Sequence, residues 1–307
     1  MREPTIVDIE DVKLETYLSL GRPGTITSKS FPVNTGVPGV HMDFKWGSLS
    51  KDYGTPRHKH TFDQIRYQLA GLRQSDDGNM LPGDCAYFPE GVLYGPQQQE
   101  EDEIGLILQF PGPSNLPYYS HEELNAARQK LLAEGGTFSG GVYTRIFPDG
   151  RKINKDSHQA CTEFLYGAPV EFPKPRFLAP IVMRPNNYQW MPDRKLTGVA
   201  HKHLGTFGER RTGMRLLHLA PGGKIPAHIQ DTAEIMYLTD GGIEYAGRTW
   251  QGGKTRDVGT FMFCPHDSDV AELTSGPGAT FFVISLPMLR EIELEQREKQ
   301  AAVLVDA

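Results

Sequence analysis

Glycine and proline recur every few residues along this chain, and the apolar runs between them are short. The 307 residues include 33 glycines and 23 prolines, and the intervening runs are rich in Val, Ile, Leu, Phe and Tyr. This spacing is typical of many short strands joined by turns, as in sandwiches and closed barrels. We therefore expect an all-β protein.

Two segments carry a helical pattern. Residues 120–134 begin with Ser120 and Glu123 in the spacing of a capping box, and Gly135 follows as a left-handed stop. The other helical segment follows Pro287 near the C-terminus. Residues 136–195 are dense in Gly, Pro, Asn and Lys, which predicts connector and docking arms.

Two β-rich blocks on either side of this region share a weak internal repeat. Each block is made of two segments, PRHKHTFDQIRYQLAG at 56–71 with GDCAYFPEGVLY at 83–94, and PAHIQDTAEIMYLTDG at 226–241 with GTFMFCPHDSDV at 259–270. Six residues separate Gln64 from Gly71, and six separate Glu234 from Gly241. Equal spacing of this kind indicates one structural unit used twice.

These blocks resemble the cupin superfamily, whose two motifs run G-x5-H-x-H-x3,4-E-x6-G and G-x5-P-x-G-x2-H-x3-N. Asp52 stands where the opening Gly of the first motif belongs. The resemblance implies a bicupin, with two antiparallel jelly-roll barrels in one chain and a few peripheral helices. We accordingly predict an N-terminal barrel with its arm at residues 1–118, a helix and connector arms at 119–195, and a C-terminal barrel with its helix at 196–307.

One strand face in the first block is unusually polar. Residues two apart in a strand share a face, so His58 and His60 point together, and Gln64, Arg66 and Gln68 share one face of the next strand. Burying these groups is costly unless each finds a partner, which is a divalent metal for paired histidines and a carboxylate for arginine. The pattern predicts a polar ligand pocket inside the first barrel.

The cupin resemblance also implies a metal in that pocket. In metal-binding cupins the ligands are two His and a Glu of the first motif and a His of the second. Here His58 and His60 are kept, Gln64 takes the Glu position and Tyr94 takes the position of the last His. The implied ion is Fe, Mn, Ni or Zn, bound by His58, His60 and Gln64 with Tyr94 and His41 as further candidates; no organic cofactor is indicated. An amide and a phenol form a weaker site than imidazoles, so metal occupancy stays open, and a strand-end position is the alternative for His41.

The segment TPRHKHTFDQIRY is similar to the ring-cleaving bicupins, the gentisate and salicylate dioxygenases. An inward arginine there helps to hold the substrate carboxylate, at the position of Arg66. The second-motif histidine that completes the iron triad in that family is missing here, so a lyase, an isomerase or a hydrolase is as compatible as a dioxygenase. We predict catalytic roles for Tyr94, Arg66 and Gln64, and substrate contacts for Arg66, Gln68 and Tyr94.

Three functions are compatible with this pocket. The first is a metal-dependent enzyme that acts on a small carboxylate-bearing organic substrate. The second is a non-catalytic small-molecule binder with degraded metal motifs, and the third is a structural or storage bicupin. The alternative for Arg66 itself is an internal salt bridge with Asp43 or Glu90.

The second block has fewer candidate ligands. His228 stands alone as an imidazole, Gln230 replaces the second histidine, and Glu234 continues into an apolar face. We expect a packed structural barrel, in which these three residues form a less favoured second pocket. His201 and His203 share a strand face, and they either form a site of their own or lie at a solvated edge or an interface.

The composition of the chain limits the kinds of partner that we expect it to bind. A net charge of −6 offers no basic field for nucleic acid. The sequence contains no run of about 18 apolar residues without a charge, so we expect no membrane span. The start of the sequence lacks the pattern of a signal peptide, so we expect a cytoplasmic protein. Three widely spaced cysteines predict buried thiols, and barrel edge strands together with the arms predict a homo-oligomer.

Overall fold

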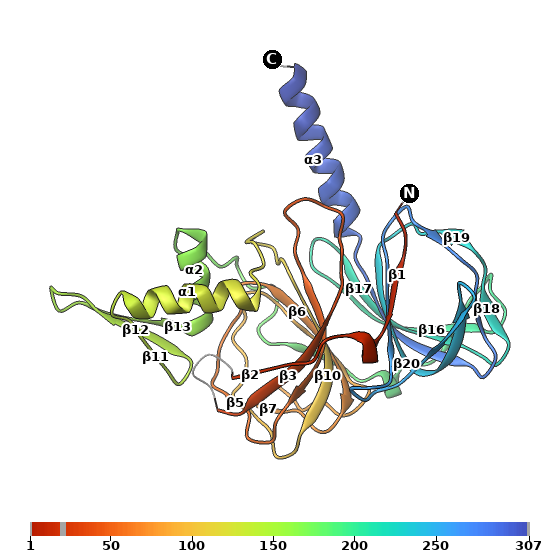
Figure 1. Ribbon diagram of the computed structural model, residues 1–307, viewed down its shortest axis with the longest axis horizontal. Helices are drawn as coiled ribbons and strands as arrows, with labels where there is room; N and C mark the ends of the chain where they lie inside the picture. Colours follow the sequence, from red (N-terminus) through yellow and green to blue (C-terminus); the bar gives the residue numbers. More distant parts are fainter. Residues whose placement is uncertain (1, 19–22, 306–307) are drawn as a thin grey trace. The chain divides into compact units, whose positions relative to one another are not determined.

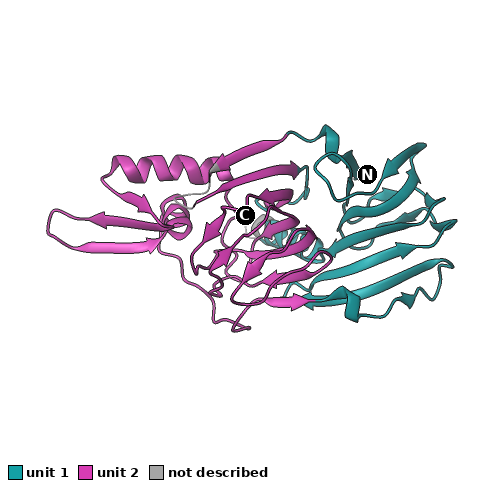
Figure 2. Cartoon of the chain, turned by 90° about the horizontal axis from the view of Figure 1, so that it is seen from below, with its two compact units in different colours: residues 1–13, 31–40, 184–307 teal, residues 14–30, 41–183 magenta. Residues whose placement is uncertain are grey.

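The computed structural model describes residues 2–18 and 23–305 and divides the chain into two compact units (Figures 1 and 2). Residues 14–30 and 41–183 form the unit that contains the first barrel, and residues 1–13, 31–40 and 184–307 form the unit that contains the second. The two units differ from the predicted boundaries at both ends of the first barrel. The start of the chain belongs to the second unit, and most of the predicted connector belongs to the first.

The first unit is built on a seven-stranded sheet. Its strands in spatial order are β14 (Ile181–Met183), β8 (Cys85–Phe88), β6 (Asp63–Ala70), β10 (Glu103–Phe110), β4 (Asp43–Leu49), β3 (Thr25–Phe31) and β2 (Glu15–Leu18). A smaller sheet has the order β5 (Gly54–Thr55), β9 (Gln97–Gln98) and β7 (Gln74–Ser75). Strand β6 is buried along most of its length, and its two faces differ in what they contact: Gln64 and Arg66 line a cavity, whereas Ile65 and Tyr67 point to the opposite face.

The region predicted to be connector arms is folded. It contains α1 (His121–Ala133), the antiparallel strands β11 (Thr137–Ser139), β12 (Val142–Ile146) and β13 (Lys152–Asp156), and α2 (Ser157–Tyr166). The predicted capping box is confirmed, because the Ser120 hydroxyl accepts from Glu123 N at 3.2 Å and the Glu123 carboxylate accepts from Ser120 N at 2.7 Å. Leu124, Leu131 and Cys161 pack in a core shared by the two helices.

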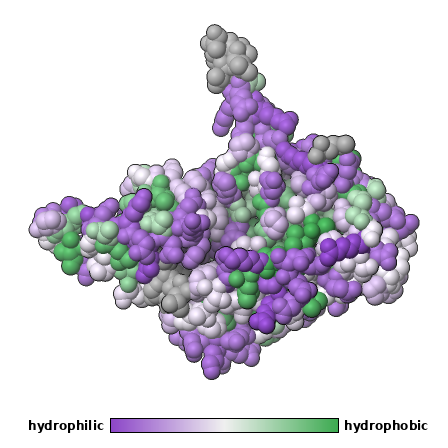
Figure 3. Space-filling view, in the orientation of Figure 1, coloured by the Kyte–Doolittle hydropathy of each residue, from purple (hydrophilic) through white to green (hydrophobic). Residues whose placement is uncertain are grey.

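The second unit is built on a ten-stranded sheet. The main path is β1 (Thr5–Asp8), β22 (Thr260–Cys264), β20 (Glu234–Tyr245), β25 (Ala279–Ser285), β17 (Thr212–Leu219), β16 (Val199–Phe207) and β15 (Met191–Pro192). The remaining strands are β18 (Gly223–Ile225), β21 (Arg248–Gln251) and β24 (Leu273–Ser275), with β19 (His228–Ile229) and β23 (Asp269–Val270) as a separate pair. Short 3-10 turns span Ile9–Asp11 and Pro185–Asn187. The predicted C-terminal helix is α3 (Met288–Val305), which begins after Pro287 and exposes mainly hydrophilic side chains (Figure 3).

Strand β1 explains why the start of the chain belongs to the second unit. It pairs antiparallel with β22, with Thr5 opposite Phe263. Ile9, directly after β1, is fully buried, and Phe31 stacks on Phe261 with ring centroids 4.8 Å apart. The edge of β22 is thereby covered by a strand from the opposite end of the sequence.

The glycines that close the repeated motif have the same backbone geometry in both barrels. Gly71 has φ +71° and Gly241 has φ +79°, a region that L side chains rarely adopt. A Cβ at Gly71 would collide with the carbonyl of Asp102, and one at Gly241 would collide with the carbonyl of Gly278. Gly71 directly follows β6, whereas Gly241 lies within β20. The equal spacing in the sequence therefore reflects a left-handed glycine at the same motif position in each barrel.

Two expectations from composition can be compared with the structure. Cys85, Cys161 and Cys264 are buried free thiols, as predicted. Among the described residues, the helices are all too short or too polar to span a lipid bilayer. The expectation of a homo-oligomer stays a prediction.

Candidate functional site

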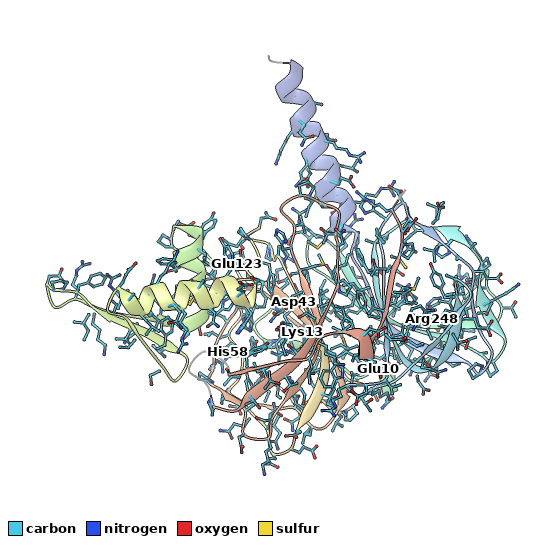
Figure 4. The ribbon with its side chains drawn as sticks, viewed as in Figure 1. Glu10, Lys13, Asp43, His58, Glu123 and Arg248 are labelled. Atoms are coloured by element: carbon cyan, nitrogen blue, oxygen red, sulfur yellow. The ribbon has the colours of Figure 1, made fainter. Side chains whose placement is uncertain are left out.

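The two motif segments of the first barrel meet at His58 and Tyr94 (His58 is labelled in Figure 4). Their backbones exchange two hydrogen bonds, from His58 N to Tyr94 O at 3.0 Å and from Tyr94 N to His58 O at 2.9 Å. Both side chains are buried, with ring centroids 4.4 Å apart. The structure thus brings these two predicted site residues together.

Each motif histidine is held by a different partner. Nδ1 of His58 donates to the carbonyl of Pro56 at 2.8 Å, which fixes the orientation of the ring. Nε2 of His60 lies 2.5 Å from the hydroxyl of Tyr94. The His58 and His60 rings are nearly perpendicular, with centroids 4.9 Å apart.

Arg66 is surrounded by neutral partners. One of its terminal nitrogens donates to the amide oxygen of Gln97 at 3.3 Å, and its guanidinium lies 4.8 Å from the ring centroid of Phe88. The Gln64 amide lies between Gln109, at 2.9 Å, and Arg66; rotation of this amide places its oxygen 2.6 Å from Nε of Arg66. Within the described part of the chain, Arg66 has no carboxylate partner.

The two acids that could have neutralised Arg66 are used elsewhere. Asp43 pairs with Lys45 at 2.5 Å. Glu90 accepts a hydrogen bond from Ser114 N at 3.0 Å, and burial raises the pKa of its carboxyl. The alternative of a structural salt bridge for Arg66 with Asp43 or Glu90 is therefore not what the structure shows.

A second arginine, Arg73, lies near Arg66 and was missed in the sequence because it follows β6 in an irregular segment. It forms a buried ion pair with Glu103. Burial and the neighbouring charge of Arg66 lower the pKa of Arg73 to about 10, so it is charged at neutral pH. Gln68, predicted to contact substrate, instead donates to Glu103 at 3.2 Å and to the carbonyl of Ala70 at 2.7 Å, and it does not line the cavity.

These residues surround a cavity of about 160 Å³ in the first unit. Its polar wall includes Lys45, Arg66 and Arg73 and the imidazoles of His58, His60, His121 and His158. No described residue that lines it is acidic. Burial opposes the charge of Lys45, but Asp43 and the hydroxyl of Tyr118 outweigh burial and raise the pKa of Lys45. The cavity therefore has a positive wall.

Two of the cavity imidazoles come from helices α1 and α2. His121 opens α1, and its pKa is lowered by burial and by the nearby positive charge of Lys45. His158 lies in the first turn of α2, with its ring perpendicular to that of His60 at 5.7 Å between centroids. Asp156 caps α2 by accepting from His158 N at 2.9 Å. An aspartate before SHQACTEFLY is an N-cap signal that would have revealed this helix in the sequence.

His41 lies outside this site. It is exposed, precedes β4, and is not among the residues that line the cavity. Its position agrees with the strand-end alternative, not with a third inward imidazole.

The predicted ligands of the first barrel lie close together but are not arranged as a cupin metal centre. Nε2 of His60 is bonded to Tyr94, and the Gln64 amide faces the guanidinium of Arg66, whose charge opposes a nearby cation. Only His58 has the backbone-held orientation typical of a metal-binding histidine. Across residues 2–18 and 23–305, no group of three or more His, Cys, Asp or Glu side chains is placed to hold a metal ion.

The less favoured second-barrel pocket has a different character. Glu234 forms a bidentate ion pair with Arg215 at 2.6 and 2.8 Å, and this charge outweighs burial and lowers the pKa of Glu234. His228 is exposed, and its Nε2 lies 3.1 Å from the amide oxygen of Gln230. These residues line a cavity of about 360 Å³, so the barrel that we expected to be packed is hollow.

The predicted histidine pair on β16 is divided between two environments. His201 lines the second-barrel cavity and donates to Asp193 at 3.0 Å. His203 stacks beside it with ring centroids 5.7 Å apart and is exposed. These contacts agree with a strand edge and not with a separate site.

The fold of this chain is similar to that of several solved structures. No protein-family model and no curated protein matches the sequence. Among solved structures, a Nostoc punctiforme protein described as a putative dioxygenase has a TM-score of 0.62 at 15% identity, covering 92% of this chain and 82% of its own. A putative glyoxylate-induced protein from Pseudomonas aeruginosa has a TM-score of 0.57 at 11% identity, covering 94% and 90%.

A third similar structure is oxalate decarboxylase from Bacillus subtilis, a protein with Mn(II) centres. It has a TM-score of 0.51 at 14% identity, covering 93% of this chain and 78% of its own. At such identities the likeness concerns the fold. Together with the repeated motif and its matching glycines, it shows that the chain has the two-barrel cupin fold.

Proposed function

We propose that the first barrel binds a small organic carboxylate and that Arg66 holds the carboxylate group. The observation that carries this proposal is the charge balance of the cavity. Lys45 is paired with Asp43 and Arg73 is paired with Glu103, whereas Arg66 contacts only neutral groups among the described residues. A partly buried guanidinium held by amides gains a charged, bidentate partner when a carboxylate enters.

The size and walls of the cavity support a compact acid. About 160 Å³ is close to the roughly 150 Å³ of an engineered apolar cavity that holds benzene. Tyr53, Phe62, Ile107 and Leu124 supply apolar surface beside the positive wall. A benzoate-sized acid, with its ring on these side chains and its carboxylate on Arg66, matches both features.

The pair of His60 and Tyr94 supports a catalytic role in addition to binding. His60 lines the cavity, and Tyr94 lies behind it, buried and hydrogen-bonded to it. Such a pair can move a proton to and from a bound substrate, with the phenol stabilising whichever imidazole form results. The proposed reaction class is proton transfer near the carboxylate, as in a lyase or an isomerase.

Isothermal titration calorimetry with benzoate, salicylate and the uncharged analogue benzamide tests the binding proposal. We expect Arg66→Gln to weaken benzoate binding by roughly 10- to 100-fold, since a hydrogen bond to a charged group contributes about 1.5–3 kcal/mol. The matched control is Arg151→Gln, which removes an arginine that is 71% exposed and lies outside the cavity. Equal benzoate affinity in wild type and Arg66→Gln, or equal affinity for benzamide and benzoate, would contradict the proposal.

The metal-dependent form of this function is tested separately by elemental analysis of the purified chain. The arrangement of Gln64 and Tyr94 leads us to expect no stoichiometric transition metal and unchanged benzoate binding after treatment with a chelator. A bound metal that is lost in His58→Ala together with benzoate affinity would show that the motif-based prediction is correct and that the geometry described above changes when metal binds.

A further inference from the structure

The second barrel encloses a cavity more than twice as large as the one in the first barrel, about 360 Å³ against about 160 Å³. Its volume lies within the 300–1,000 Å³ typical of small-molecule sites, whereas packed cores contain few voids larger than a water molecule. The wall is mainly apolar. Val199, Leu217, Met236, Met262, Val270 and Leu273 contribute to it.

The charges of this cavity cancel. Arg215 and Glu234 form a bidentate pair, and Ser285 bonds to both of them, accepting from Arg215 at 2.9 Å and donating to Glu234 at 2.8 Å. Asp231, which also lines the cavity, is paired with Arg290 at 3.1 Å, so each acidic or arginine side chain of the lining already has its partner. A charged ligand would lose its hydration here without gaining an unpaired counter-charge, so the cavity favours an uncharged molecule.

Part of the cavity lining is exposed to solvent and includes polar side chains. His228 and Ile229 are exposed residues that line the cavity, and Gln230 lies beside them with its amide donating to the carbonyl of Thr232 at 2.6 Å. The lining thus combines apolar side chains with polar ones near solvent. This arrangement suits a molecule that has one polar end and an apolar body.

We propose that the second barrel is a separate binding site for an uncharged, mainly apolar small molecule with one hydrogen-bonding end. The two barrels share one repeated motif, but the first then binds an anion and the second an uncharged molecule. In the first, Arg66 lacks a carboxylate partner among the described residues and favours an anion; in the second, Glu234 neutralises Arg215 and favours a neutral molecule.

The probes are p-cresol and its anionic counterpart 4-methylbenzoate, titrated calorimetrically into the full chain carrying Arg66→Gln, so that the anion site of the first barrel does not contribute. The test variant is Val199→Phe, which adds volume to the cavity wall. Its matched control is Val283→Phe, because Val283 is a fully buried residue of the same core that does not line the cavity.

We expect p-cresol to bind with at least tenfold preference over 4-methylbenzoate, and we expect Val199→Phe to lose at least tenfold in p-cresol affinity while keeping its melting temperature. Val283→Phe should lower the melting temperature because its added volume has no space. Ile225→Phe, at a half-buried lining position, repeats the test if Val199→Phe does not fold. The proposal is overturned if p-cresol does not bind at millimolar concentration, if both lining variants bind it as the parent does, or if the anion binds as tightly.

Discussion

Tyr94 and His60, 34 positions apart in the sequence, share a hydrogen bond with 2.5 Å between the phenol oxygen and Nε2. Tyr94 is 1% exposed, so water does not compete for this bond. A hydrogen bond in such surroundings is electrostatically stronger than one in water. The phenol therefore fixes the orientation of the imidazole that lines the cavity.

Replacing Tyr94 with Phe removes this bond and preserves ring packing against Phe88, whose centroid is 4.8 Å away. We expect carboxylate binding to change by less than about threefold and proton transfer to fall by roughly 100-fold or more. The measurement is loss of C–H signals of small carboxylates in D₂O, followed by proton NMR with wild-type and variant protein. An unchanged exchange rate in Tyr94→Phe would contradict a role of Tyr94 in proton transfer, and no exchange with wild type would leave a protein that only binds the acid.

Removal of the charge of Arg73 should destabilise the protein much more than removal of the charge of Arg66. Arg73→Met leaves Glu103, which is 1% exposed, as a buried charge without its partner, and we expect a loss of about 3–5 kcal/mol in the free energy of unfolding. Arg66→Met removes a cation that has no carboxylate partner among the described residues, so its cost should stay below about 1 kcal/mol. Urea unfolding followed by circular dichroism measures both. Equal losses would mean that Arg66 also belongs to a structural ion pair.

The buried carboxyl of Asp63 makes stability depend on pH. Burial raises its pKa to about 6 from an ordinary value of 3.8, despite hydrogen bonds from Glu90 N and the Tyr87 hydroxyl, each at 2.7 Å. The folded state thus binds the proton more tightly than the unfolded state does. The resulting stability is fully present below about pH 4 and is lost as the pH rises to about 6, amounting to at most about 3 kcal/mol.

We expect Asp63→Asn to remove most of this slope between pH 4 and 6, as measured by urea unfolding at several pH values. Asp257→Asn is the control, because Asp257 is 61% exposed and should leave the slope unchanged. If stability instead increases from pH 4 to 6 and Asp63→Asn abolishes that increase, the shift has the opposite sign.

Much of the fold could be predicted from the sequence because cupin strands carry local signals. The alternation of Gln64 and Arg66 with Ile65 and Tyr67 determines which face of β6 points inward, and the spacing to Gly71 marks the strand end. The capping residues of α1 are equally local. These features depend on neighbours within a few residues, so one sequence suffices to predict them.

The remaining features depend on contacts between distant residues. Gln68 lies on the predicted face, but it is drawn away from the cavity by Glu103, 35 positions later. His158 and Arg73 reach the cavity from segments without a barrel pattern. The second-barrel cavity is a property of packed volume, which residue type alone does not determine.

The pairing of β1 with β22 also determines whether one unit can be isolated by cutting the backbone, and in which order the units can fold during synthesis. Asp8 and Thr260, whose side chains are hydrogen-bonded, are separated by 252 positions. No single cut in the backbone releases one unit intact, because residues 1–13 and 31–40 belong with 184–307. During synthesis β1 leaves the ribosome long before β22 is made, so completion of the second barrel must await the synthesis of β22, while residues 41–183 are free to fold earlier.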